Sequence, residues 1–454
     1  MSGIRALEPS LDSRGVTASA PRGALLRIAT VAWIAGMATL FPLGNDALEV
    51  VSILTFDRIA FLAVLALSAV EVIRRPRVLR HAGRVEAAFG AYLGVVLLSW
   101  LSSLSEKSAL DAKRDGDLLL MCFAMPALAF AIARHGEWTH RQVRICAWVL
   151  FAGVGAYFVA VGFVQAFVDW SFLVPEAAWD VHRNRARGPF PNALPYSIVL
   201  ALLLLLAPFL AADGLPRRQR WWIGALGAAL LEAFVLSRIR IVWAALATAL
   251  SFVAFTGPPM RRTSLLMLSG LALAMFVAYS GLDGRLALPR GALRVEGFSE
   301  RVLDAEPVYN RIAVYSTALN MIRHRPLFGF GVGSRTFRNL KAEYYTSCCG
   351  VSVQWAESSD VPHNEILNLL VLMGVVGLLA YLGLVWTLWR SLSLAQEPLP
   401  DPGEAALMTC VRAQFILLVG TAVLHDTMYL AQAQVIFFFF AGLATRVHVR
   451  AETA

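Results

Sequence analysis

The sequence predicts an all-α integral membrane protein with about twelve transmembrane helices and one large loop on the outer face. Of its 454 residues, 58% are hydrophobic and only 16% are charged, and the mean hydropathy is +0.62. The apolar residues occur in blocks of about 18–25, each long enough to cross ~30 Å of hydrocarbon as a helix. A soluble chain of this length would form several domains with much more charged surface.

The predicted spans follow the apolar blocks in chain order. Residues 1–23 form a polar cytoplasmic tail, and the first block lacks a convincing signal-peptide cleavage site, so we expect it to be retained. Nine spans occupy 24–281, the large loop occupies 282–362, three spans occupy 363–446, and 447–454 form a second cytoplasmic tail. The twelve predicted ranges are 24–43, 49–73, 85–103, 117–133, 142–168, 194–212, 220–236, 240–256, 263–281, 364–389, 405–424 and 430–446.

Alternate connections between the spans are rich in arginine, and this pattern predicts the orientation. The positive-inside rule places the basic connections and both termini in the cytoplasm. The remaining connections, including the large loop, then face outward. Because the charge sits in short loops between apolar blocks, the net charge of +9 does not predict a nucleic-acid partner. The inward arginines after the second, fourth, sixth, eighth and last spans include Arg74, Arg75, Arg77, Arg80, Arg84, Arg134, Arg141, Arg144, Arg217, Arg218, Arg220, Arg261, Arg262, Arg446 and Arg450.

The large outward loop is predicted to be folded. Its charges are nearly balanced, unlike those of a disordered tail. Within 310–325, Ile312, Tyr315, Leu319 and Ile322 recur at helical spacing, which predicts an amphipathic helix. The loop is therefore interpreted as a lid over the membrane surface or over a cavity.

Three outward elements carry arginine. The first has Arg183, Arg185 and Arg187 followed by Asn192, the second is a tight turn with Arg238 and Arg240, and the third is the large loop with Arg311. The arginine fork stays charged and suits phosphate, so two such elements at one cavity would bind a phosphorylated lipid. Each arginine alone could instead be an interfacial anchor for lipid headgroups.

His363 ends the large loop and directly precedes an apolar span. An ionisable imidazole in this place indicates chemistry at the water–lipid boundary, although it could also be a satisfied histidine at a helix start. Asn364 could cap that helix or contact a substrate. The other outward histidines, His182, His324 and His425, have no ligand spacing and no clustered carboxylate partners, so no metal is expected. The adjacent Cys348 and Cys349 also lack metal or redox spacing.

Taken in order, several short motifs resemble the bacterial O-antigen ligase/polymerase superfamily. They are Arg187-Gly188 with Pro191-Asn192, Ser237-Arg238 opening a span, Arg311 with Pro326-Leu327-Phe328-Gly329-Phe330-Gly331, and His363-Asn364 with Gly374 and Gly377. The resemblance covers roughly 185–385. Ser237-Arg238-Ile239 departs from the Ser-Arg-Gly that is frequent in the family.

The resemblance implies a glycosyltransferase of GT-C-like architecture with its active site on the periplasmic face of the inner membrane. The donor would be a glycan on undecaprenyl pyrophosphate, and the acceptor a sugar hydroxyl of lipid A–core. Membrane lipids would surround the protein, and neither metal nor another cofactor would be needed.

The proposed chemistry gives each candidate residue a role. His363 would be the general base, and Arg187 and Arg238 would stabilise the pyrophosphate leaving group. The substrate-binding candidates are Arg183, Arg185, Arg240, Arg311, Asn192 and Asn364.

Three alternatives remain at this point. A Wzy-type O-antigen polymerase or an O-linked oligosaccharyltransferase would use similar parts. A lipid-linked sugar transporter belongs to a different class, but the spans show no obvious inverted repeat.

Overall fold

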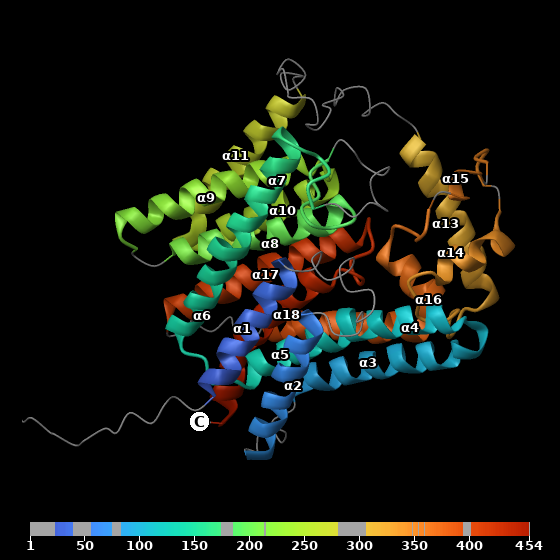
Figure 1. Cartoon of the computed structure of the whole chain (residues 1–454), viewed down its shortest axis with the longest axis horizontal. Coiled ribbons are helices and arrows are strands. Elements are labelled where there is room, and N and C mark those ends of the chain that lie inside the picture. The colour runs from blue at the N-terminus through green and yellow to red at the C-terminus, as the bar shows by residue number, and fades with distance from the viewer. Residues whose placement is uncertain are drawn as a thin grey trace, which may run out of the picture.

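The computed structural model describes residues 23–39, 56–74, 83–173, 185–212, 215–279, 306–346, 348–352, 354–357, 359–393 and 401–453. Over these residues the chain is almost entirely helical and contains no strand, only an isolated bridge between Cys348 and Val351. The all-α prediction is confirmed. The α-helices (Figure 1) are α1 (Ala24–Thr39), α2 (Phe56–Arg74), α3 (Arg84–Ser102), α4 (Ala109–Leu119), α5 (Met125–His135), α6 (His140–Trp148), α7 (Gly155–Phe167), α8 (Ala193–Ala211), α9 (Arg217–Leu236), α10 (Arg240–Thr256), α11 (Arg261–Tyr279), α13 (Glu306–His324), α14 (Thr336–Leu340), α15 (Gln354–Glu357), α16 (Glu365–Ser393), α17 (Pro402–Ala422) and α18 (Ala431–Thr453).

Six helical segments of the described chain are long and apolar enough to cross a membrane. They support the membrane class that the composition predicts. A helix lies at each of the twelve predicted ranges, but the others are shorter or less apolar, so the number twelve stays a prediction. The six segments are Arg84–Glu106, Ala109–His135, His140–Phe167, Ala193–Ala211, Glu365–Ser393 and Pro402–Ala422.

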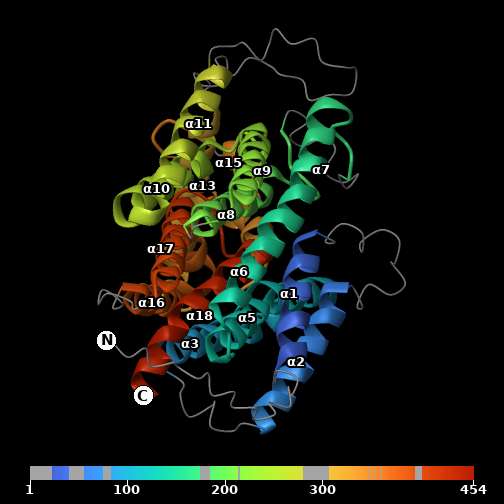
Figure 2. The same ribbon diagram turned by 90° about the vertical axis from the view of Figure 1, so that its left-hand side faces the viewer.

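Helix α8 forms the centre of the bundle. All its residues from Ala193 to Leu210 are buried, as expected for a helix that is apolar on every side. It packs against α9, α10, α17 and α18, and Figure 2 shows the first three of these around it.

Contacts along α17 show which helix ends lie together. Cys410 and Gln414 donate side-chain hydrogen bonds to the carbonyls of Leu205 (3.2 Å) and Leu202 (3.4 Å), so α17 and α8 are antiparallel. A Cβ on Gly420 would lie 3.6 Å from that of Ala245, whereas Gly257 lies beside Thr409, so α17 and α10 are also antiparallel. The starts of α8 and α10 therefore lie at the same end as the last turn of α17.

We call this the site end of the bundle, and it also includes the start of α16. Glu365 in the first turn of α16 accepts a hydrogen bond of 2.6 Å from the backbone N–H of Thr427, just beyond α17. The site end thus comprises 185–193, 237–240, 363–365 and 423–428. Most of the sequence-predicted candidates fall within these four segments.

The described part of the large loop is a small helical unit with its own apolar core. Figure 1 shows α13, α14 and α15 beside the bundle, next to α16. The predicted helix at 310–325 is confirmed as α13, but its apolar face was partly wrong, because Leu319 is 48% exposed. Smaller residues one step round the helix are buried instead, which allows close packing on α15 and α16. The core consists of Ala313, Val314, Ala318, Met321, Phe330, Phe337, Val351, Ala356 and Val371.

Helix α16 is interrupted at Gly374, where φ is 62° and ψ is −162°. The segment 326–331 inserts at this break and replaces the lost helical hydrogen bonds. The N–H groups of Phe330 and Gly331 each donate at 2.9 Å to the carbonyls of Val371 and Leu372. In return, Pro326 and Leu327 accept from the N–H groups that follow Gly374. Non-helical backbone is tolerated in a membrane helix only when neighbours satisfy it in this way.

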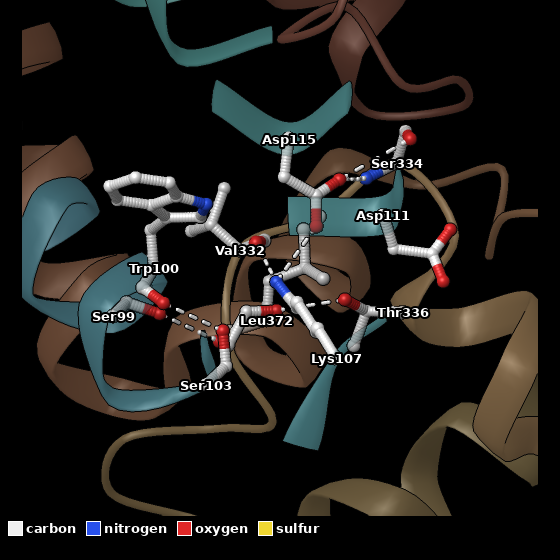
Figure 3. A network of polar contacts seen from close by, with 12 residues as sticks. Ser99, Trp100, Ser103, Lys107, Asp111, Asp115, Val332, Ser334, Thr336 and Leu372 are labelled. Atoms are coloured by element: carbon white, nitrogen blue, oxygen red, sulfur yellow. Dashed lines mark hydrogen bonds and ion pairs between the residues drawn. The ribbon is translucent and has the colours of Figure 1, made fainter. Parts of the chain in front are cut away.

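A buried ion pair holds the next residues of the inserted segment (Figure 3). Lys107 and Asp115 lie 2.8 Å apart, and only 11% and 4% of their side chains are exposed. Lys107 also donates to the Val332 carbonyl at 2.6 Å, and Asp115 accepts from the Ser334 N–H at 2.9 Å. We call residues 326–336 with 371–376 and this ion pair the loop junction. Because Ser99 of α3 donates to the Leu372 carbonyl at 3.1 Å, the junction fixes the large loop to α3, α4 and α16.

Candidate functional site

His363 lies in a tight turn immediately before α16. Its φ of +53° is in the left-handed region, which a non-glycine residue occupies at a cost of about 1–3 kcal/mol. The hydroxyl of Tyr315 on α13 lies 3.4 Å from its carbonyl oxygen and donates to it. The imidazole is therefore held between the large loop and the bundle.

The two residues after His363 clamp the start of α16 to the connection that follows α17. The Asn364 carboxamide accepts from the Leu367 N–H at 3.0 Å and donates to the Val423 carbonyl at 2.7 Å. The buried Glu365 carboxylate accepts from the N–H groups of Thr427 and Met428 at 2.6 and 3.1 Å. The clamp brings His425 and Asp426 beside His363.

His363, His425 and Asp426 form a compact cluster at the site end. The two imidazole rings lie 5.1 Å apart in an edge-on arrangement. One nitrogen of each ring and one carboxylate oxygen of Asp426 all lie within 4.8 Å of one another. Asp426 is only 5% exposed. Nδ1 of His363 is buried without a hydrogen-bond partner in the described chain, and the buried Asp426 oxygens have only the nearby backbone N–H groups of His363 and Asn364, which do not reach hydrogen-bond geometry. Buried polar atoms of this kind are rare and often belong to functional sites.

The surroundings keep both histidines neutral. Burial and the positive charge of Arg311 lower the pKa of His363, and Asp360 offsets this in part. Burial, His363 and Arg311 lower the pKa of His425 to about 3. Burial raises the pKa of Asp426 to about 7, although the backbone N–H groups of His363 and Asn364 act in the opposite direction. The cluster thus contains two neutral bases and a carboxyl group that titrates near neutral pH.

Two imidazoles with a carboxylate are also a possible ligand set for a metal ion. No carboxylate was expected beside the histidines predicted to face outward. This was wrong, because the fold places Asp426, 63 residues further along the chain, beside His363. Two features oppose a metal. Arg311 contributes a positive charge, and Nδ1 of His425 accepts a hydrogen bond of 3.0 Å from the Asp426 N–H. A metal-ligating imidazole normally donates from its second nitrogen instead of accepting there.

The predicted arginine elements meet at the same end of the bundle. The N–H of Ala186 donates to the Leu236 carbonyl at 3.0 Å, which joins the Arg187 segment to the Arg238 turn. The Gln165 side chain accepts from the N–H groups of Arg187 and Gly188 at 3.0 and 2.9 Å, and so fixes this segment from α7. The Arg187 segment and the Arg238 turn are therefore held together by hydrogen bonds and are anchored to α7.

Arg187 and Arg238 differ in their surroundings. Arg187 is 1% exposed, its guanidinium lies 5.8 Å from the Trp170 ring, and burial lowers its pKa. Arg238 is half-buried and occupies the turn between α9 and α10 with a φ of +56°. Arg238 and His363 are thus two of the four non-glycine residues with positive φ in the described chain. Two of the three predicted catalytic residues lie in strained turns.

The remaining candidates are also mostly at the site end. Arg185 is half-buried, and Arg240 begins α10 with its side chain exposed. Asn192 caps α8 by accepting from the Leu194 N–H at 2.8 Å. Arg311 on α13 is half-buried close to both histidines. Arg183 lies outside the described residues.

Asp426 and His425 were not assigned a role from the sequence. An acid directly after a histidine in a short connection predicted to face outward was the available signal. The partnership with His363 depends on tertiary contacts, which a single sequence does not reveal.

Residues 225–382 match the family model described as O-Antigen ligase. This segment includes Arg238, Arg311 and His363. The match covers about a third of the chain, and this segment is similar to the O-antigen ligase family.

Two proteins named "Putative polysaccharide ligase" are also similar to part of the chain. The protein from Rickettsia conorii is 28% identical over 120 residues, which are 26% of this chain and 29% of that protein. The protein from Rickettsia felis is 27% identical over 113 residues, or 24% and 27% of the two chains. The matched segments thus cover less than a third of each of these two proteins.

Proposed function

We propose that the protein is an O-antigen ligase. It transfers a glycan from undecaprenyl pyrophosphate to a sugar hydroxyl of lipid A–core, on the periplasmic face of a bacterial inner membrane. The observation that supports this most is the common location of the histidine cluster and the arginine segments at one end of an apolar helix bundle. The proposal includes twelve spans, with the large loop on the periplasmic face.

His363 is the general base in this proposal. Its Nδ1 is buried, so Nε2 is the atom that takes the proton from the acceptor hydroxyl. A neutral imidazole is required for this step, and burial together with Arg311 favours the neutral form. General-base catalysis of this kind contributes ~10²–10⁴-fold to a rate.

Asp426 completes the base. When Nε2 accepts a proton, the ring must already carry one on Nδ1 and becomes an imidazolium. A buried carboxylate beside the ring can accept from the Nδ1 proton and stabilise that positive charge, as the aspartate of a Ser-His-Asp triad does. One nitrogen of His363 and one carboxylate oxygen of Asp426 lie within 4.8 Å, so the proposal requires this contact to shorten when substrate binds.

The arginines act on the leaving group. As the sugar–phosphate bond breaks, negative charge develops on the undecaprenyl pyrophosphate. Arg187 and Arg238 are assigned to stabilise it, because preorganised guanidinium groups need no rearrangement as the charge forms. Arg183, Arg185, Arg240 and Arg311 contribute to donor binding, and Asn192 and Asn364 to substrate contact.

Direct attack by the acceptor hydroxyl inverts the anomeric centre. The pyrophosphate linkage supplies the free energy, so the reaction needs neither a nucleotide nor a metal ion. A chelator should therefore leave transfer intact.

The test compares His363→Ala and Arg238→Ala with the unmodified protein at matched membrane levels in a deletion strain. Both variants should abolish capped lipopolysaccharide. Arg238→Lys should also impair transfer, because an ammonium group cannot form the bidentate contact of a guanidinium. Normal capping by His363→Ala or Arg238→Ala would refute the assignment.

The same strain separates ligase from polymerase. Loss of capped lipopolysaccharide with accumulation of lipid-linked polymer is expected for a ligase. Lipopolysaccharide capped by single repeat units would instead identify a polymerase.

A further inference from the structure

His425 is fixed as a hydrogen-bond donor beside the proposed base. A neutral imidazole has one N–H and one nitrogen with a free lone pair. Nδ1 of His425 accepts the Asp426 N–H at 3.0 Å, so Nδ1 carries the lone pair. The ring proton must then be on Nε2.

The position of the His425 Nε2–H favours a contact with substrate over a structural hydrogen bond. The His425 ring lies 5.1 Å from the His363 ring, and its side chain is half-buried. Nε2 makes no hydrogen bond in the part of the chain that the structure describes. Asp426 follows His425 directly and is buried, so the backbone holds the ring in place.

The charges around His425 indicate which kind of oxygen it would contact. Arg311 lies close to both rings, and a second positive charge there would be repelled. The ring is therefore a neutral donor, which suits a neutral sugar hydroxyl. In the proposed mechanism, the phosphate oxygens bind the charged guanidinium groups of the arginine segments instead. The group that must lie closest to His363 is the acceptor sugar, because His363 removes its proton.

We propose that His425 is a positioning residue for the acceptor glycan, donating from Nε2–H to a sugar hydroxyl oxygen next to the hydroxyl that His363 deprotonates. This inference rests on the proposed function. It adds a specificity contact on the acceptor side, whereas the arginines serve the donor.

Two variants separate this role from a purely structural one. The H425N side chain retains an acceptor near the Nδ1 position and so preserves the bond from the Asp426 N–H, but it has no donor at the Nε2 position. The H425Q side chain has a donor near the Nε2 position and loses the Nδ1 acceptor. If His425 positions the acceptor, H425Q should perform better than H425N. If it only holds the loop, H425N should perform better.

The experiment uses the full chain in nanodiscs with a lipid-pyrophosphate glycan as donor and lipid A–core glycolipid as acceptor. For H425N we expect the KM for the acceptor to rise ~3–10-fold, about the loss of one neutral hydrogen bond, with the KM for the donor unchanged. H425Q should recover much of the acceptor KM. A rise in donor KM instead would indicate a phosphate contact and overturn the proposal.

Binding is measured separately, so that this inference and the proposed function can fail independently. The affinity of lipid A–core glycolipid is determined without donor for the unmodified protein, H425N and H425Q. Absence of transfer by the unmodified protein would refute the proposed function, and the order of the three affinities would still decide on His425. Equal affinities, or tighter binding by H425N than by H425Q, would overturn the proposal.

Discussion

The histidine cluster at the site end and the loop junction are both buried polar sites, but they differ in how well their groups are satisfied. At the loop junction, Lys107 and Asp115 pair with each other and also bond the backbone of 332–334. In the histidine cluster, Nδ1 of His363 has no partner in the described chain, and the Asp426 oxygens have only backbone N–H groups nearby that do not reach hydrogen-bond geometry. A satisfied network specifies structure, whereas unsatisfied buried groups persist where function requires them.

Removing one partner of the loop-junction ion pair should have the largest effect on stability. Lys107→Met leaves the buried Asp115 charge unpaired, which should cost about 3–5 kcal/mol. The free energy of unfolding, or thermal stability in nanodiscs, measures this loss. Arg325→Gln is the matched control, because Arg325 pairs with Glu106 at an exposed site and contributes at most about 1 kcal/mol. Equal losses in the two variants would contradict the structural role of the junction.

Asp426→Asn should show the opposite behaviour. Transfer should fall at least ~10²-fold, because the amide cannot stabilise the imidazolium of His363. Stability should stay the same or increase, since a poorly satisfied buried carboxylate is removed. Asp111→Asn, at an aspartate whose carboxylate accepts from the Ser108 hydroxyl at 2.8 Å, is the control and should retain transfer. A D426N protein that unfolds easily would place Asp426 with the structural networks instead.

The glycine at the break of α16 tests how the junction is built. Gly374→Ala forces a side chain into left-handed backbone, at a cost of about 1–3 kcal/mol, and its Cβ would overlap the Leu327 carbonyl. Gly383→Ala in the same helix meets no atom within 4 Å and should be neutral. Thermal stability of the two purified variants provides the comparison, and a stable G374A protein would rule out the inserted segment.

The smallest effect concerns the pH profile of transfer. The positive charge of Arg311 lowers the pKa of His363, so Arg311→Gln should raise that pKa toward its ordinary value. Because the base acts in its neutral form, transfer falls as the pH drops through this pKa. The acidic limb of the profile should therefore move to higher pH in the variant. An unchanged limb would mean that His363 does not limit the rate at low pH.

Helix positions were largely predictable from the sequence, because apolar blocks of membrane length leave little choice of structure. The buried face of α13 was harder to predict. It contains Ala313 and Ala318, which the spacing of large hydrophobic residues does not single out. The interruption of α16 at Gly374 could not be predicted from the glycine alone, because it depends on the insertion of a segment about 45 residues earlier in the chain.

The candidate site also contains some residues that the sequence predicts and others that only the fold reveals. His363 and the arginines predicted to face outward were identifiable from residue type and position. Asp426 was not, because it reaches His363 through the clamp of Asn364 and Glu365 on the 423–428 connection. Asn364 and Asn192, predicted as substrate contacts, both cap helices. Their substrate roles stay predictions.

The central claim is that the histidine cluster transfers a glycan from a lipid pyrophosphate, and reconstitution tests it most directly. Purified protein in nanodiscs is supplied with undecaprenyl-pyrophosphate glycan and lipid A–core in the presence of a chelator, and product is followed over time. We predict glycan-capped lipid A–core with the unmodified protein and a loss of ~10²–10⁴-fold with His363→Ala. Transfer at an equal rate by His363→Ala would contradict the account.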